Sequence, residues 1–214
     1  MHSPKTQCAA VRMSADYYYT IERSGSAEYK DRGSRFIAFA FPVSDSTEFK
    51  TRLHEIRNEH PKAAHHCFAY RIGTDSNNFR SSDNKEPPGS AGKPILGQID
   101  SRQLTNACII VVRYFGGTLL GIPGLINAYK TAASMALQTT PIVQKPVEII
   151  YRLEFDYTIT NQVMTLVKKY NCTIRSNQTE MFCLMEIGIP KAVLELVTLK
   201  LRDIKGLELK ETSQ

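Results

Sequence analysis

The sequence predicts an α+β protein of two domains, and three features of the chain lead to that prediction. A continuous apolar run from Ala107 to Val112, followed by glycines, is typical of a strand buried on both faces. The stretch from Thr139 to Pro146 contains two prolines and indicates a linker. After it, the apolar periodicity alternates in the order βαββαβ, which predicts a ferredoxin-like domain over residues 147–214.

The composition is that of a globular protein without a membrane span. Of the 214 residues, 42% are hydrophobic and 22% are charged, which is enough for real cores. No apolar run approaches the roughly 20 residues of a membrane helix, and the chain starts without the apolar stretch of a signal peptide. The five cysteines include no CxxC pair, so we expect neither a disulfide framework nor a cysteine zinc site. We therefore expect a cytoplasmic protein with no membrane partner.

The net charge of +6 is unevenly distributed along the chain. Residues 1–146 carry 18 Lys and Arg against 12 Asp and Glu, whereas residues 147–214 carry nine of each. The positive first part favours an acidic partner, with nucleic acid as the first choice. The alternative is a mild basic excess that only keeps the protein soluble.

The first domain is expected to span residues 17–140, after a flexible arm over residues 1–16. Asp45, with Glu48 three residues later, resembles the capping box that begins a helix, and Pro61 ends that helix. The expected elements are an edge strand at 19–29, a strand at 36–41, a helix at 46–60, a strand at 63–72, a structureless loop at 73–92, a short helix from 94, a strand at 107–112 and a helix at 125–137.

The linker is expected at residues 141–146, and the second domain begins at residue 147. Its expected elements are a strand at 148–158, a helix at 161–170, strands at 172–178 and 181–189, a helix at 191–203 and a strand at 207–211.

The most concentrated chemical signal lies where the central strand of the first domain ends. Arg113 and Tyr114 follow the apolar run, Gly116 and Gly117 allow a sharp turn, and a helix begins shortly afterwards. A helix start suits an anion, and a guanidinium at the end of an apolar strand needs a carboxylate, a phosphate or water. We expect Arg113 to point outward into an anion site. The alternative is a turn whose glycines only let two backbones touch.

A second glycine-rich stretch, from Glu86 to Pro94, resembles a P-loop only superficially. Proline stands where the first glycine should be and again after the lysine, so nucleotide binding has little support. Lys93 at a helix start still gives a second candidate anion site, with an ordinary helix cap as the alternative. Asp83, Glu86 and Ser90 are candidates for acid, base or nucleophile, although no GxSxG elbow fixes their geometry and solvated loop residues are the simpler interpretation.

Two adjacent histidines, His65 and His66, lie on an expected strand. Neighbouring residues on a strand point to opposite faces, so the two rings cannot readily bind one ion. No histidine pair has the HExxH spacing. We therefore expect no metal and no cofactor. One histidine should face the core, and the other, where exposed, could stack on a base.

Several motifs occur together in the order and spacing of a known family. They are DRGSRFI at 31–37, AHHCFAYR at 64–71, GKPILGQI at 92–99 and VVRYFGG at 111–117, followed by Leu120-Gly121 and Gly124-Leu125. Over residues 17–137 the chain resembles the IMPACT/YigZ family, formerly an uncharacterised family. Its βαββαβ tail resembles the C-terminal domain of the bacterial members.

This resemblance implies a first domain of the ribosomal protein S5 domain 2 type, with helices on one face of a sheet, and a tail like the last domain of elongation factor G. It also implies a nucleic-acid-binding or translation-regulating role, without a settled biochemical activity. The eukaryotic members regulate a translation-control kinase pathway through an extra N-terminal domain, for which this chain has no room, so we do not expect that partner.

One loop departs from the family pattern. The family usually reads Asp-Asp-Gly-Glu-Pro-Ser-Gly-Thr-Ala-Gly, whereas residues 83–92 read DNKEPPGSAG. Asn84 replaces a carboxylate and Lys85 replaces a glycine. The exchange weakens a paired-acid or metal role for the loop and adds a cation.

Together these observations predict an RNA-binding, translation-associated regulatory protein whose partner is RNA or a ribosome-associated component. Cations would hold phosphates, a base would stack on an aromatic ring, and the glycine turns would admit the RNA backbone. The expected surface consists of Arg35, His66, Arg71, Lys93, Arg113, Tyr114, Gly116, Gly117 and Lys130.

Two other functions remain open. One is an enzyme acting on a small anionic or phosphorylated molecule, for which the S5-type fold offers an analogy only. A closed cavity near Arg113, Lys93 and Glu86 would favour it, whereas an open basic sheet face would favour RNA. The other is a protein-binding module at the ribosome.

Overall fold

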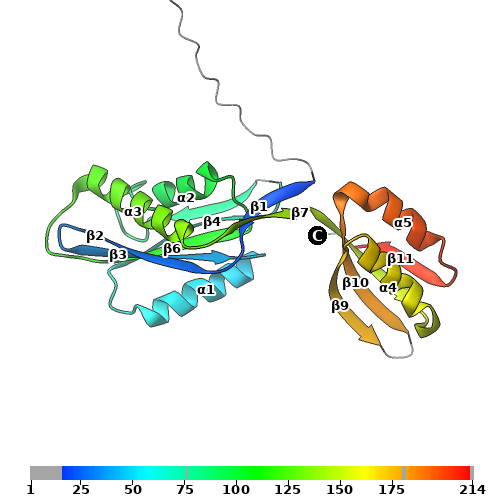
Figure 1. The fold of residues 1–214 in the computed structure, drawn as a ribbon. Helices are drawn as coiled ribbons and strands as arrows, with labels where there is room; N and C mark the ends of the chain where they lie inside the picture. Colours follow the sequence, from blue (N-terminus) through cyan, green and yellow to red (C-terminus); the bar gives the residue numbers. More distant parts are fainter. Residues whose placement is uncertain (1–15, 76, 180–181, 213–214) are drawn as a thin grey trace, which may run out of the picture. The chain divides into compact units, whose positions relative to one another are not determined.

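Figure 1 shows the computed structural model of the chain, which describes residues 16–75, 77–179 and 182–212. The chain divides into two compact units, one formed by residues 18–145 and the other by Tyr17 with the residues from Pro146 onward. The expected arm at residues 1–16 lies outside the described residues except for Asp16. None of the described helices is both long and apolar enough to cross a membrane.

The first unit is built on a five-stranded antiparallel sheet with the strand order β2-β3-β6-β4-β5. A separate two-stranded sheet pairs β1 with β7. The elements of this part of the chain are β1 (Tyr17–Ile21), β2 (Gly25–Asp31), β3 (Ser34–Pro42), α1 (Ser46–Glu59), β4 (His65–Ile72), β5 (Asn78–Ser82), α2 (Gly92–Ser101), β6 (Ala107–Tyr114), α3 (Gly121–Gln138) and β7 (Ile142–Pro146).

The central strand β6 is covered on both of its faces. Its residues are buried from Ala107 to Arg113, as the apolar run predicts. Helices α2 and α3 lie on one face of the sheet and α1 lies on the other (Figure 1). The expectation of helices on one face only is therefore wrong. The physical reason is that Ile110 and Val112 point away from α2 and α3, and Leu53 of α1 shields them from water.

Two segments that were expected to lack regular structure form strands. Within the long loop, β5 pairs with β4, and within the expected linker, β7 pairs with β1. Both strands are short and mostly solvent-exposed, so their sequences carry no apolar alternation that would reveal them. The single edge strand expected at residues 19–29 is wrong, because the chain bends at Glu22 and Arg23 and forms two strands, β1 and β2, in different sheets. The remaining expected boundaries differ from the observed ones by a few residues.

The second unit contains the βαββαβ order that the sequence predicts. Its four-stranded antiparallel sheet has the order β11-β8-β10-β9. Helices α4 and α5 share one apolar core with one face of this sheet, and the other face has no helix among the described residues (Figure 1). The elements are β8 (Glu148–Phe155), α4 (Thr160–Lys169), β9 (Thr173–Thr179), β10 (Cys183–Pro190), α5 (Leu194–Arg202) and β11 (Leu207–Glu211), with 3-10 turns at Tyr157–Ile159 and Lys191–Val193.

Gly188 on β10 makes room for a side chain from the neighbouring strand. A Cβ at this position would lie 2.3 Å from Oε2 of Glu148 on β8. Because that Cβ is missing, Glu148 reaches across β10 to the edge strand β9. There it accepts hydrogen bonds from Oγ1 of Thr173 and from Nη2 of Arg175, the latter at 3.3 Å.

Candidate functional site

The end of β6 forms a buried polar cluster under the loop that joins β5 to α2. Nη1 of Arg113 lies 2.7 Å from Oε1 of Glu86, and the two side chains are 6% and 4% exposed. The expectation that Arg113 points outward into an anion site is therefore wrong. A buried guanidinium requires a paired acceptor, and the chain supplies its own carboxylate.

Glu86 is also the acceptor for a tyrosine on α3. Oη of Tyr129 donates to Oε1 of Glu86 at 2.8 Å, and the thiol of Cys67 on β4 lies 3.3 Å from the same tyrosine oxygen. Burial raises the pKa of the Cys67 thiol to about 12 and also raises the pKa of Tyr129. Nε2 of His65 lies 3.7 Å from Glu86 at the solvent-facing side of the cluster. At neutral pH, Tyr129 and Cys67 therefore act as neutral hydrogen-bond donors.

Aromatic rings enclose the guanidinium of Arg113. Its central carbon lies 5.4 Å from the ring centre of Phe36 and 5.6 Å from that of Phe115. Such cation–π contacts are strongest where water is excluded. The cluster has the properties of an internal structural junction, since it ties β3, β6, the loop and α3 together without leaving the charge in solvent.

The second expected anion site, at the start of α2, is filled by Asp83. Its carboxylate accepts backbone hydrogen bonds from Gly89, Ala91 and Gly92 at 2.8–3.0 Å. Partial burial opposes ionisation of Asp83, but these N–H donors outweigh it and hold the carboxyl pKa below its usual range. An anionic ligand at this helix start would have to displace a carboxylate that is already bound. The ordinary helix cap is not observed either, because the N-cap residue Ala91 forms no side-chain cap hydrogen bond and Asp83 occupies the helix start from a distance.

The glycine turn after β6 is in part a packing turn. A Cβ on Gly116 would lie 1.9 Å from the carbonyl carbon of Gly33, so the β2–β3 hairpin occupies the space beside it. Gly117 has a φ of 86° and no atom within 4 Å of an added Cβ. Gly116 therefore serves contact between two backbones, and only Gly117 faces open space.

The opposite face of the sheet brings three of the expected surface residues together. The rings of Tyr114 and His60 are joined by a hydrogen bond of 2.9 Å between Oη and Nδ1, and the guanidinium of Arg35 lies 5.7 Å from the Tyr114 ring centre. Arg35 also forms two hydrogen bonds with Glu28, at 3.2 and 2.9 Å. Nε2 of His66 lies 3.1 Å from the His60 carbonyl oxygen, and burial lowers the His66 pKa.

The remaining candidates lie elsewhere. Arg71 pairs with Asp100 at 2.7 Å on the face that carries α2 and α3. Lys93 is exposed on α2 and Lys130 is exposed on α3. Ser90 is buried, and its hydroxyl donates to the Pro87 carbonyl oxygen at 2.7 Å. The structure thus distributes the expected surface over both faces of the sheet and does not bring it into one site.

The sequence reasoning missed Tyr129 and His60. Tyr129 falls on the buried stripe of α3, and a buried tyrosine hydroxyl generally needs a partner, which was the available signal. His60 lies at the expected helix end, and its spacing of six residues from His54 does not fit the HExxH pattern. Its contact with Tyr114 joins residues 54 positions apart, which no local pattern reveals. Among the described residues, no group of three His, Cys, Asp or Glu side chains is placed to hold a metal ion.

Comparison with known proteins places the chain in a family. The Impact N-terminal domain matches residues 32–137. An IMPACT family member of Haemophilus influenzae is 33% identical over 188 residues, covering 86% of this chain and 91% of that protein. IMPACT family member YigZ of Escherichia coli is 33% identical over 172 residues, covering 79% and 84%.

A third relative, IMPACT family member YvyE of Bacillus subtilis, is 36% identical over 141 residues, and the match spans 66% of this chain and 65% of that protein. A crystal structure of a hypothetical protein is similar in fold, with a TM-score of 0.72 and 28% identity, covering 93% of this chain and 98% of that chain. Because relatives at 33% identity match over most of both chains, the chain belongs to the IMPACT family.

Proposed function

We propose that this protein binds single-stranded RNA in a translation-associated, regulatory role, and that it does so on the sheet face that carries α1. The observation that carries the proposal is a row of three residues across neighbouring strands: Lys30 on β2, Arg35 on β3 and Tyr114 on β6. Opposing residues on adjacent strands lie side by side on one face. The row offers two cations for phosphate and one ring for stacking, which is the combination found in single-strand binders.

The surroundings of this row support the proposal. Phe39 lies on the same face of β3 and is half-buried, so a second ring is available along the strand. Helix α1 contacts β4 and β6 most, and it reaches β3 through Arg52, whose guanidinium lies 5.5 Å from the ring centre of Phe41, at the opposite end of β3 from Arg35. One carboxylate, that of Glu28, serves both Lys30 and Arg35, so the row keeps a net positive charge.

The fold assignments support the same role. We infer that the first unit is of the ribosomal protein S5 domain 2 type and that the second is a ferredoxin-like domain resembling the last domain of elongation factor G. The resemblance to the IMPACT/YigZ family implies nucleic-acid binding or translation regulation, with RNA or a ribosome-associated component as partner. The buried ion pair of Arg113 with Glu86 does not favour the enzyme, because the guanidinium that would bind an anionic substrate is already paired with a carboxylate.

Titration of labelled single-stranded RNA at several salt concentrations tests the proposal. If the two cations neutralise about two phosphates, affinity should fall roughly sevenfold for a fourfold rise in salt. Arg35→Ala and Lys30→Ala should each weaken binding and lower the salt slope by about 0.7. Tyr114→Leu should weaken binding by about 1–3 kcal/mol with little change in slope.

One further variant is a matched control, and another should change the affinity in the opposite direction. Lys205→Ala removes one exposed cation from the second unit and should leave RNA affinity unchanged. Glu28→Gln removes the carboxylate that competes for Arg35 and should strengthen binding. This surface would be ruled out if none of the row variants changed the RNA affinity, or if the RNA affinity did not depend on salt concentration.

A further inference from the structure

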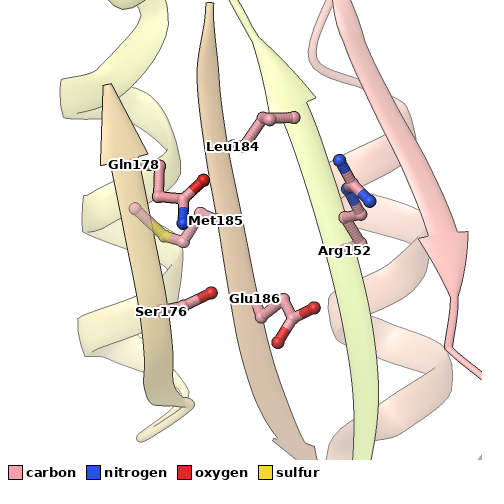
Figure 2. Close-up of a pocket in the computed structure, with 6 residues that line it drawn as sticks. All are labelled: Arg152, Ser176, Gln178, Leu184, Met185 and Glu186. Atoms are coloured by element: carbon pink, nitrogen blue, oxygen red, sulfur yellow. The ribbon is translucent and has the colours of Figure 1, made fainter. Parts of the chain in front are cut away.

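The second unit carries a hollow on the sheet face opposite its helices. Its volume is about 230 Å³, which is enough for a small molecule of up to roughly a dozen heavy atoms. It spans β8, β10 and the edge strand β9 (Figure 2). The lining residues are Arg152, Ser176, Gln178, Leu184, Met185 and Glu186.

The floor of this hollow contains an opposite-charge pair that is not joined. Arg152 and Glu186 are direct partners in the β8–β10 register. Such residues have Cβ atoms about 5 Å apart, and opposite charges there usually pair. In the described part of the chain neither side chain has an ion-pair partner within 4.0 Å. Figure 2 shows the guanidinium and the carboxylate pointing to different ends of the hollow.

The charged neighbours of Arg152 and Glu186 on this part of the sheet are already paired with other groups. Lys210, opposite Arg152 on β11, lies 3.1 Å from Glu208 on its own strand. Arg175 on β9 is held by Glu148. Arg152 and Glu186 are therefore left as one donor fork and one acceptor on the same floor.

The edge strand opposite Glu186 is irregular. Glu186 pairs with Ser176 and Ile187 pairs with Ile174, so Arg175 is an extra residue on β9. A bulge of this kind bends the strand that carries it, and bulges are frequent beside binding sites. Glu186, Ser176 and Leu184 are half-buried, whereas Arg152 is exposed, so the acceptor lies at the bottom and the guanidinium at the rim.

We propose that this hollow binds a free α-amino acid with a small polar side chain. The ligand's carboxylate lies on Arg152 and its ammonium lies on Glu186. In an α-amino acid these two groups are separated by one carbon, which suits two side chains on opposing strand positions. Leu184 packs against the ligand's carbon atoms, and Ser176 and Gln178 hydrogen-bond its polar side chain. The balanced charge of residues 147–214 also fits a ligand without net charge.

Binding is tested on the full chain by NMR titration with L-serine, L-threonine, L-asparagine and L-glutamine. At least one should shift the amides of β8, β9 and β10 at millimolar concentration. The N-acetyl derivative lacks the ammonium and the amino acid amide lacks the carboxylate, so each should bind roughly tenfold more weakly.

Variants assign the two ends of the ligand. Arg152→Gln should reduce affinity for the amino acid and remove the discrimination against its amide. Glu186→Gln should remove the discrimination against the N-acetyl derivative. Lys205→Gln and Glu195→Gln, both exposed, make the same charge changes outside the hollow and should bind normally.

No shift with any of the four amino acids would overturn the proposal, as would binding that neither Arg152→Gln nor Glu186→Gln affects. Both positions are on an open sheet face, so the variants are expected to fold, and unchanged amide dispersion verifies this. The outcome is independent of the RNA test, because the Lys30–Arg35–Tyr114 row belongs to the other unit.

Discussion

Arg113 and Glu86 form an ion pair of 2.7 Å in a region from which water is almost excluded. Their positions are 27 residues apart, and the loop between β5 and α2 brings them together. The pair is further held by Tyr129, which donates to the same carboxylate oxygen. The positive charge of Arg113, which the sequence pattern assigns to ligand binding, thus fixes the loop to the sheet.

Removing one member of this pair should destabilise the first unit strongly. Glu86→Ala leaves a buried guanidinium without its carboxylate, and we expect it to lower the free energy of unfolding by about 3–5 kcal/mol. Hydrogen exchange of the β6 amides measures this in the full chain. Glu22→Ala removes an exposed carboxylate and is the control. The double variant Glu86→Leu/Arg113→Leu should lose less free energy of unfolding than Glu86→Ala, because it leaves no unpaired buried charge. Equal, small effects of Glu86→Ala and Glu22→Ala would contradict a structural role for the pair.

Glu28 should stay ionised in acid well below the usual range of a carboxyl group. Hydrogen bonds from Arg35 and Lys30 lower its pKa to about 2. Because the folded-state pKa is depressed, the stabilising pair is fully present above the ordinary pKa of about 4.3 and is lost as the pH falls toward 2. NMR titration of the side-chain carboxyl carbon measures the midpoint. Arg35→Ala should move that midpoint upward, and an unmoved midpoint would show that Arg35 is not the main cause.

The two glycines after β6 should differ in their tolerance of a methyl group. Gly116→Ala places a carbon 1.9 Å from the Gly33 carbonyl carbon, so the hairpin and the turn must separate. An added methyl group at Gly117 meets no atom, so Gly117→Ala costs only the strain of a positive φ, about 1–2 kcal/mol. Urea unfolding followed by circular dichroism should therefore give Gly116→Ala a much lower free energy of unfolding than Gly117→Ala. The reverse order would mean that the β2–β3 hairpin does not rest on this turn.

The buried thiol on β4 should be protected from alkylation. Burial raises the pKa of Cys67 to about 12, so almost no thiolate exists at pH 8, and solvent does not reach the sulfur. Cys172 is only half-buried, with a pKa raised to about 11. Iodoacetamide labelling read by mass spectrometry should modify Cys172 first and Cys67 only when the unit unfolds. Similar labelling rates for the two cysteines would contradict the closed cluster.

The predictable parts of the fold are those with a strong local signal. The run at residues 107–112 and the helix after Asp45 have apolar periodicity and a cap, and both are confirmed. The edge strand β5 escaped prediction because polar residues dominate it. The face that α1 covers also escaped, since the choice between two faces of a buried strand is made by tertiary packing.

The candidate site shows the same limit more sharply. Residue types correctly marked the end of β6 and the 83–92 loop as chemically dense. They could not reveal that Glu86 belongs to Arg113 and that Asp83 belongs to the start of α2, because these partnerships close only in three dimensions. Pairing within the chain and pairing with a ligand require the same side chains, so composition alone does not separate them.

The bridge from Glu148 to the edge strand β9 couples two positions that are 40 residues apart in sequence numbering, namely Glu148 and Gly188. Any side chain at position 188 would displace the Glu148 carboxylate. Arg175 and Thr173 would then lose their hydrogen-bond acceptor and be hydrated instead. Among related chains, a long acidic residue at the first position should therefore coincide with glycine at the second. In relatives with a short residue in place of Glu148, the space beside position 188 is open, and that position should vary in sequence.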